Sequence, residues 1–162
     1  MLFSEWKTNN FNNIMVNLQG RLNGLYGAIE NFTSLRDDID AWFNELKGLT
    51  LMYSEEYVNN FITNELYEFS QKNYLLYRKL ASFNQDGGFS DQDKEDIKNS
   101  YSVGGFDTNN QDLTSGALRN DHSTSSKNKL SNLDVLNKLK NIKLLEREKF
   151  LNKIKECLVI IW

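Results

Sequence analysis

The residues with the clearest potential for chemistry lie near the middle of the sequence, in the stretch SFNQDGGFSDQD from Ser82 to Asp93. This stretch places oxygen-bearing side chains at intervals on both sides of Gly87. Hard cations such as calcium are bound by oxygen ligands of this kind. The five side chains that could hold calcium are Ser82, Asn84, Asp86, Ser90 and Asp93.

The spacing resembles a calcium loop of the EF-hand or dockerin type, over these residues only. Two positions depart from that pattern. The first ligand is Ser82 where such loops have aspartate, and the last is Asp93 where they have a bidentate glutamate. Only Asp86 and Asp93 therefore supply carboxylates at ligand positions. The resemblance implies a weak calcium site with a structural role, and we expect no other cofactor.

A second interpretation is that the same residues only turn the chain and begin a helix. The run Asp86-Gly87-Gly88 is typical of a turn. Ser90 can cap a helix, with Asp93 three residues further on completing a capping box. The sequence leaves both interpretations open.

No set of residues in the sequence matches a known catalytic arrangement. The sequence holds no phosphate-binding loop and no paired Cys/His ligand set. His122 is the only histidine, and it lacks the third group that would hold a catalytic base in place. Cys157 is the only cysteine, which excludes an internal disulfide. We expect a protein without enzymatic activity.

The elements around the loop are predicted to be helices, because apolar residues recur at intervals of three and four. The chain contains no proline, so nothing forbids long uninterrupted helices. The expected fold class is all-α: a helical bundle with long antiparallel helices, a long polar loop and an amphipathic C-terminal helix. The expected helices cover residues 11–32, 33–48, 54–83 and 131–162.

Three glycines, Gly20, Gly24 and Gly27, fall within the first expected helix. Each costs a helix about 1 kcal/mol relative to alanine. They indicate either a bend or close approach to another helix, or a poorly formed helix that breaks near Gly20.

The polar tract after Tyr101 is longer than most loops inside compact domains. It divides the expected organisation into a helical body at 1–101, a polar loop at 102–128 and a C-terminal helix at 129–162. The large apolar residues Phe106, Leu113 and Leu118 could anchor this tract to a neighbouring subunit.

The C-terminal segment reads as an amphipathic helix that Ser131 caps. It ends in the apolar run CLVIIW, which we expect to be buried in the chain's own bundle or in a partner. The residues predicted to make these contacts are Phe150, Ile154, Leu158, Ile161 and Trp162.

Charge is divided unevenly along the chain. Residues 1–126 hold 10 basic and 18 acidic side chains, whereas residues 127–162 hold 9 basic and 4 acidic ones. The basic helix could dock on an acidic surface of its own body or of another subunit, which we favour. It could also present a solvated face, or bind nucleic acid.

The compartment signals are consistent with one another. The start MLFSEWKTNN lacks the basic and apolar regions of a secretory signal peptide, so secretion by that route is not expected. No apolar run approaches the about 20 residues that a membrane-spanning helix needs, so no membrane partner is expected.

The order of a helical body, a long polar tract and a basic amphipathic helix is similar to that of small helical bacteriophage virion proteins of the head–tail connector or collar adaptor type. The resemblance lies in the layout and carries over no site residue. It implies a structural protein that forms a homo-oligomeric ring with other virion proteins, in the virion or the host cytoplasm. The alternatives are a regulatory protein-binding module that uses the calcium loop, and a nucleic-acid binder that uses the basic helix.

Overall fold

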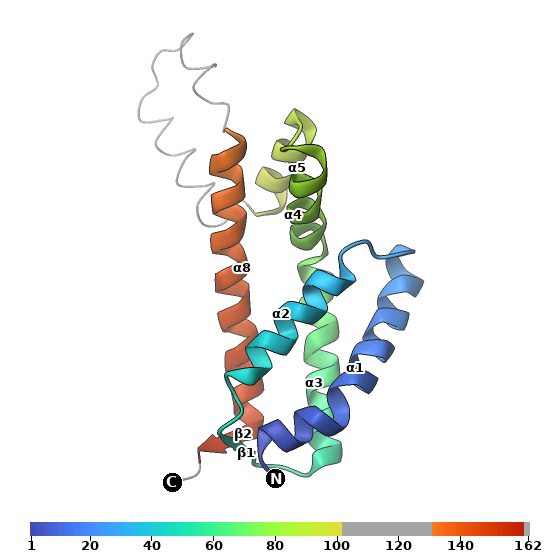
Figure 1. Cartoon of the computed structure of the whole chain (residues 1–162), viewed down its shortest axis with the longest axis vertical. Helices are drawn as coiled ribbons and strands as arrows, with labels where there is room; N and C mark the ends of the chain where they lie inside the picture. Colours follow the sequence, from blue (N-terminus) through green and yellow to red (C-terminus); the bar gives the residue numbers. More distant parts are fainter. Residues whose placement is uncertain (102–130, 161–162) are drawn as a thin grey trace. The chain divides into compact units, whose positions relative to one another are not determined.

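The computed structural model describes residues 1–101 and 131–160, with only the backbone at 84–86. The described residues form six helices and two short strands, so the expected all-α class is confirmed (Figure 1). They group into two units. Unit 1 comprises Met1–Tyr77 and Glu146–Trp162, and unit 2 comprises Arg78–Leu145. The predicted division at residues 101 and 129 borders residues outside the description and stays a prediction.

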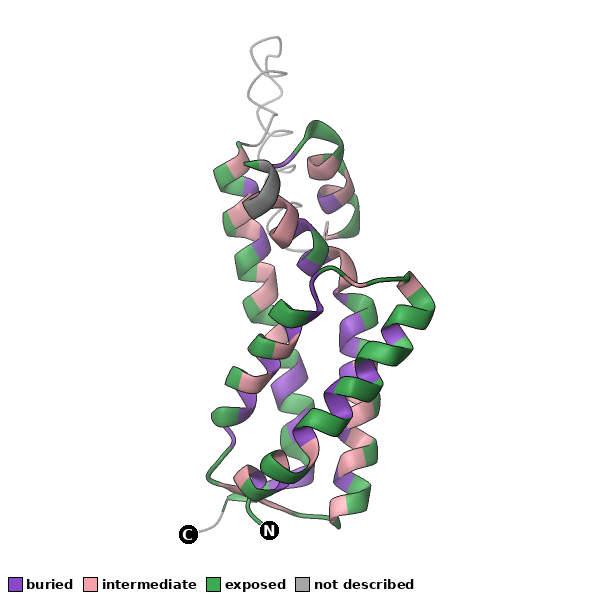
Figure 2. Cartoon of the chain, turned by 45° about the vertical axis from the view of Figure 1, so that its right-hand side comes forward, coloured by how far each residue is buried: buried purple, intermediate pink, exposed green. Residues whose placement is uncertain are grey.

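Unit 1 is built from helices that alternate in direction. Helices α1 (Phe3–Tyr26) and α3 (Glu55–Lys72) begin close to a small strand pair. Helix α2 (Phe32–Asn44) and the last turns of α8 (Asn132–Ile154) lead back to it. Figure 2 shows buried and exposed residues alternating along α1, as an amphipathic helix requires.

The strand pair consists of β1 (Leu49–Leu51) and β2 (Leu158–Ile160), which run antiparallel. Thr50 of β1 is opposite Val159, and it also bridges to Leu2 on the other side. Three segments that are far apart in the sequence therefore meet at one end of unit 1.

The core of unit 1 is an aromatic cluster centred on Phe43 of α2 and Phe150 of α8. The Phe43 ring lies 5.2 Å from that of Phe3, 5.9 Å from that of Phe11 and 6.4 Å from that of Phe150. The Phe150 ring lies 5.1 Å from that of Phe69 on α3. Such ring pairs add about 0.5–1.5 kcal/mol each beyond the burial of their area. The cluster thus joins all four helices of this unit.

Unit 2 contains most of α4 (Tyr74–Asp86), α5 (Asp91–Ser100) and the first turns of α8. The loop before α5 is fixed to the start of α8, because the Phe89 N–H donates to Oδ1 of Asn132 over 3.1 Å. Gly88 has a φ of 144°, and a Cβ there would lie 2.3 Å from Nδ2 of Asn132. This contact therefore requires glycine.

Three predicted helix starts are confirmed by their capping hydrogen bonds. The side-chain oxygen of Ser54 accepts from the Tyr57 N–H, and that of Ser90 accepts from the Asp93 N–H. The Ser131 oxygen accepts from the N–H of Asp134 over 3.1 Å.

The first helix differs from its prediction. It begins at Phe3 instead of residue 11, runs through Gly20 without a break and ends at Gly27, whose φ is 75°. Nothing lies within 4 Å of a Cβ built on Gly20 or Gly24, so close approach to another helix, one of the alternatives, is wrong among the described residues.

The single helix expected over residues 54–83 is also wrong, since it divides at Asn73 into α3 and α4. Asn73 is fully buried, and its side-chain amide donates to the Phe69 carbonyl over 3.0 Å. The Asn73 backbone N–H donates to the same carbonyl over 3.0 Å, so the side chain adds a second bond at the helix end. Asparagine also has a low helix propensity, which favours a helix end at this position.

The C-terminal helix expected to reach residue 162 ends at Ile154, and β2 follows after a short turn. The β-branched run Val159-Ile160 favours an extended backbone over a helix. Cys157 and Leu158 are buried as predicted, but Val159 and Ile160 are 37% and 62% exposed. Burial in the chain's own bundle is therefore wrong for these two residues, while their burial in a partner stays a prediction.

The aromatic cluster yields a first prediction. We expect Phe43→Ala to lower the free energy of unfolding by about 3–5 kcal/mol, because it removes a ring of α2 that contacts α1 and α8. Urea denaturation followed by circular dichroism measures this loss. The control Val16→Ala removes a side chain that is 62% exposed, and it should change stability by less than about 0.5 kcal/mol. A similarly small change for Phe43→Ala would contradict the role of the cluster.

Candidate protein-docking site

The predicted calcium loop covers the end of α4, the turn at residues 87–90 and the start of α5, so that Ser82, Asn84 and Asp86 lie in α4 and Asp93 lies in α5. Ser90 and Asp93 form the capping box of α5, in which the Ser90 N–H also donates to the Asp93 carboxylate over 3.4 Å. The ammonium of Lys79 lies 2.5 Å from the same carboxylate. Both residues therefore have structural partners within unit 2, as the turn-and-cap interpretation predicts.

Calcium binding by this loop stays a prediction. The side chains of Asn84 and Asp86 lie outside the described residues, and Ser82 is half-buried. The residues that the structure describes bring no three His, Cys, Asp or Glu side chains together in a metal-binding group. A calcium ion would also have to compete with Lys79 for Asp93.

The residues predicted to contact a partner fall into two groups. Phe150, Ile154 and Leu158 are at most 6% exposed and pack in the core of unit 1. Their contact with another subunit stays a prediction. Such a contact would require the other subunit to replace part of this core. The remaining predicted contacts, Phe106, Leu113, Leu118, Ile161 and Trp162, lie outside the described residues, as does His122.

Large apolar side chains are instead exposed around the strand pair, on a surface that we call the apolar end. They come from three segments, and their exposed fractions range from 37% to 62%. Its members are Met1, Leu2, Met52, Tyr53, Val159 and Ile160.

Backbone hydrogen bonds hold these segments together. The Leu51 N–H donates to the Met1 carbonyl over 2.9 Å, and the Met52 N–H donates to the Cys157 carbonyl over 2.8 Å. The apolar side chains are thus displayed by a connected backbone. Exposed apolar side chains gathered at one end make this a candidate site of protein association.

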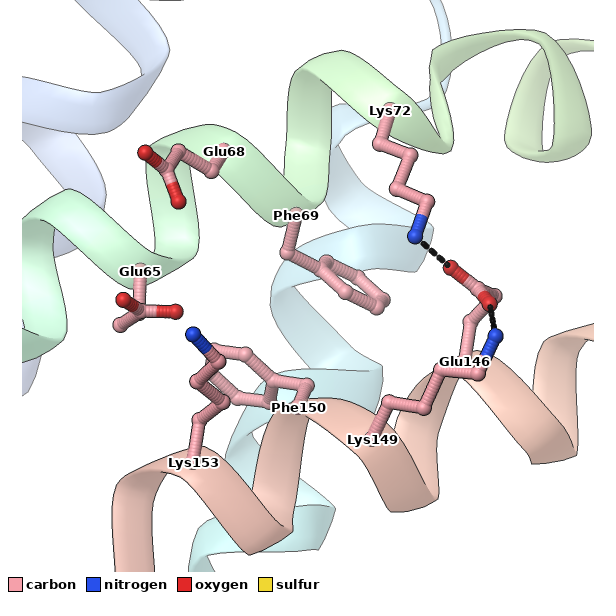
Figure 3. Close-up of a pocket in the computed structure, with 8 residues that line it drawn as sticks. All are labelled: Glu65, Glu68, Phe69, Lys72, Glu146, Lys149, Phe150 and Lys153. Atoms are coloured by element: carbon pink, nitrogen blue, oxygen red, sulfur yellow. Dashed lines mark hydrogen bonds and ion pairs between the residues drawn. The ribbon is translucent and has the colours of Figure 1, made fainter. Parts of the chain in front are cut away.

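A groove of about 400 Å³ lies between α3 and α8 within unit 1. Figure 3 shows the buried rings of Phe69 and Phe150 between two charged rims. The rim of α3 carries Glu65, Glu68 and Lys72, and the rim of α8 carries Glu146, Lys149 and Lys153. An apolar floor with rims of both signs is suited to contact with a polypeptide.

Glu146 is the buried charge of this groove. Its carboxylate lies 3.3 Å from the Lys72 ammonium and 3.0 Å from that of Lys149. Burial acts to raise the pKa of Glu146, but the two ammonium groups outweigh it and hold the pKa below its usual range. The pair with Lys72 joins the two rims, whereas the pair with Lys149 lies within α8.

Two basic residues near the end of α8, Arg147 and Lys149, form ion pairs within the chain. Arg147 pairs with Glu45 and also with Glu148, the latter over 2.9 Å. The pairing with Glu45 agrees with the prediction that the basic helix docks on an acidic surface of its own body.

Cys157 is buried beside the strand pair. Its burial, followed by the charges of Glu156 and Glu65, raises the pKa of the thiol. A raised pKa lowers the thiolate fraction and hence the reactivity of a cysteine. The thiol is therefore suited to packing.

Sequence reasoning missed the apolar end because its members occur as short pairs without a helical period. A signal was present in LTLMY and CLVII, two short runs rich in residues that favour strands. In the part of the chain that the structure describes, no helix is both long and apolar enough to cross a membrane.

Comparisons of the chain with protein-family models, with curated proteins and with solved structures found no match.

The Lys79–Asp93 pair predicts loss of stability in acid. The hydrogen bond from Lys79 lowers the pKa of Asp93 in the folded chain. The stabilisation is therefore complete above the unfolded pKa of about 3.9, and it is lost as the pH falls through the lower folded value. At pH 7, Asp93→Asn should cost about 2 kcal/mol and should weaken the decline in acid.

Thermal unfolding followed at pH 7, 5 and 3 measures this effect. The matched control is Asp91→Asn, which changes an exposed acid in the same first turn of α5. Equal losses for the two variants would show that the pair with Lys79 contributes nothing beyond a charge near the helix start.

The same geometry predicts the outcome of a calcium titration. Because Asp93 is held by Lys79 and by the Ser90 backbone, calorimetry with millimolar calcium should give no heat beyond dilution. A saturable heat that disappears in Asp93→Asn would instead establish the loop as a calcium site.

Proposed function

We propose that this chain is a non-enzymatic assembly protein that forms homo-oligomers through its apolar end. The observation that carries the proposal is the gathering of exposed apolar side chains on one surface of unit 1. Ile160 is 62% exposed, Met52 49% and Met1 48%. Burying such a surface gains about 25 cal/mol for each Å² removed from water, which favours association.

The layout of the sequence adds to this proposal. A helical body, a long polar tract and a basic C-terminal helix are the order found in phage connector and collar adaptor proteins, which the chain resembles. The proposed oligomer is accordingly a ring that works in a virion or in the host cytoplasm, next to other virion proteins. The absence of an enzymatic role rests on the residue inventory of the sequence.

A second candidate is a regulatory module that binds another protein. The groove between α3 and α8 favours it, because Phe69 and Phe150 could receive an apolar side chain between charged rims. A nucleic-acid binder has weaker support, since Arg147 and Lys149 are engaged in ion pairs within the chain. It would also need bases that are free to contact phosphates.

Native mass of the full-length chain tests the proposal. We expect light scattering after gel filtration to give a discrete oligomer, and Met52→Lys to reduce its mass because a charge would be buried in the contact. The matched control is Leu25→Lys on α1, since Leu25 is 48% exposed and Met52 is 49% exposed.

Circular dichroism establishes that both variants keep their helices. A wild-type chain that stays monomeric at all concentrations contradicts the proposal. Equal effects of the two substitutions would show that the apolar end is not the contact.

A further inference from the structure

The outer edge of β2 has backbone groups available for another strand. In an antiparallel pair, successive residues alternate between facing the partner strand and facing away from it. The Met52 N–H donates to the Cys157 carbonyl, so the backbone groups of Cys157 face β1. By the same alternation, the backbone N–H and C=O of Val159 face Thr50, and those of Leu158 and Ile160 point away from β1. No other strand of the described residues pairs with this edge.

The groups on this edge differ in what they can still bind. The Leu158 N–H donates to the Lys155 carbonyl, which closes the short turn before β2. The Leu158 carbonyl and the Ile160 N–H remain as an acceptor and a donor on the outer side. A second strand that offers one donor and one acceptor at matching positions would satisfy both.

A second copy of β2 offers that pattern. If two copies run antiparallel about a twofold axis at Val159, the Ile160 N–H of each faces the Leu158 carbonyl of the other. Twofold symmetry therefore creates two equivalent hydrogen bonds, and it places the two Val159 side chains opposite each other.

The side chains on this face are compatible with such pairing. The register puts Leu2, Thr50 and Val159 in one row across the sheet. Leu2 is 38% exposed and Val159 is 37% exposed. Neither a charge nor a proline occurs in Leu158–Ile160, although natural edge strands usually carry such residues to prevent pairing. A second copy would extend both the sheet and its apolar row.

We propose that two copies of this chain associate by antiparallel pairing of their β2 strands, with Val159 on the twofold axis. The pairing continues the sheet formed by β1 and β2, and it rests on the proposed function because it names one contact of the assembly. A twofold contact closes as a dimer, so a ring built from such dimers needs a second contact. The partner is a second copy of this chain, since the edge complements itself.

Cysteine crosslinking tests the register directly. In a Cys157→Ala background, Val159→Cys places the two thiols at a non-hydrogen-bonded pair, where the Cα atoms lie about 4.5 Å apart and a disulfide can form. The matched control is Ile160→Cys in the same background. In the proposed pairing, residue 160 of one copy and residue 160 of the other are diagonal neighbours about 7–8 Å apart, beyond the usual range for a disulfide. Ile160 is nevertheless more exposed than Val159.

We expect mild oxidation to convert Val159→Cys into a covalent dimer much faster than Ile160→Cys, as followed on non-reducing gels. Equal rates, or faster crosslinking of Ile160→Cys, would overturn the proposed pairing. If the wild-type chain assembles but Val159→Cys does not crosslink, the pairing is wrong while the proposed function stands. A wild-type chain that is monomeric contradicts both.

A backbone variant provides a second test that needs no new thiol. Ile160→Pro removes the outward N–H and leaves the bonds between β1 and β2 in place, so the native mass should fall. Ile160→Ala shortens the same side chain but keeps the N–H, and it should retain more of the assembly. If Ile160→Pro keeps the wild-type mass, the proposed hydrogen bonds do not form.

Discussion

The contact between the Phe43 and Phe150 rings is the interaction on which unit 1 depends. Phe43 carries α2 onto α1, and Phe150 brings the end of α8 onto α2 and α3. The last turns of α8 are therefore part of the core and not an appendage to it. Replacing either ring would leave a cavity at the point where the four helices meet.

The position of the strand pair follows from this packing. Because the end of α8 is fixed in the core, the chain after Ile154 emerges beside β1, where β2 pairs with it. Residues 1–2 reach the other side of β1 because α1 begins directly after them. The helical core thus collects three short apolar segments at one end, and none of them could bury its side chains alone.

Helical periodicity predicted the apolar faces well, because the repeat extends over many residues and a single wrong residue does not change which face is buried. It missed the division at Asn73, where the buried side-chain amide and the backbone N–H both donate to the Phe69 carbonyl. It also missed β2, which forms only because the core brings β1 alongside. At the candidate calcium loop, capping chemistry identified the partners of Ser90 and Asp93, but the ion pair with Lys79 depends on helix packing that no local pattern contains.

The helical core of unit 1 displays the edge of β2, through which we propose that two copies associate. Residue-resolved amide hydrogen exchange at several protein concentrations tests it most directly. The account predicts that exchange of the Ile160 amide slows as concentration rises, because association provides its acceptor. The Val159 amide, which faces β1, should be protected throughout. An Ile160 amide that exchanges at the same rate at every concentration would contradict the account.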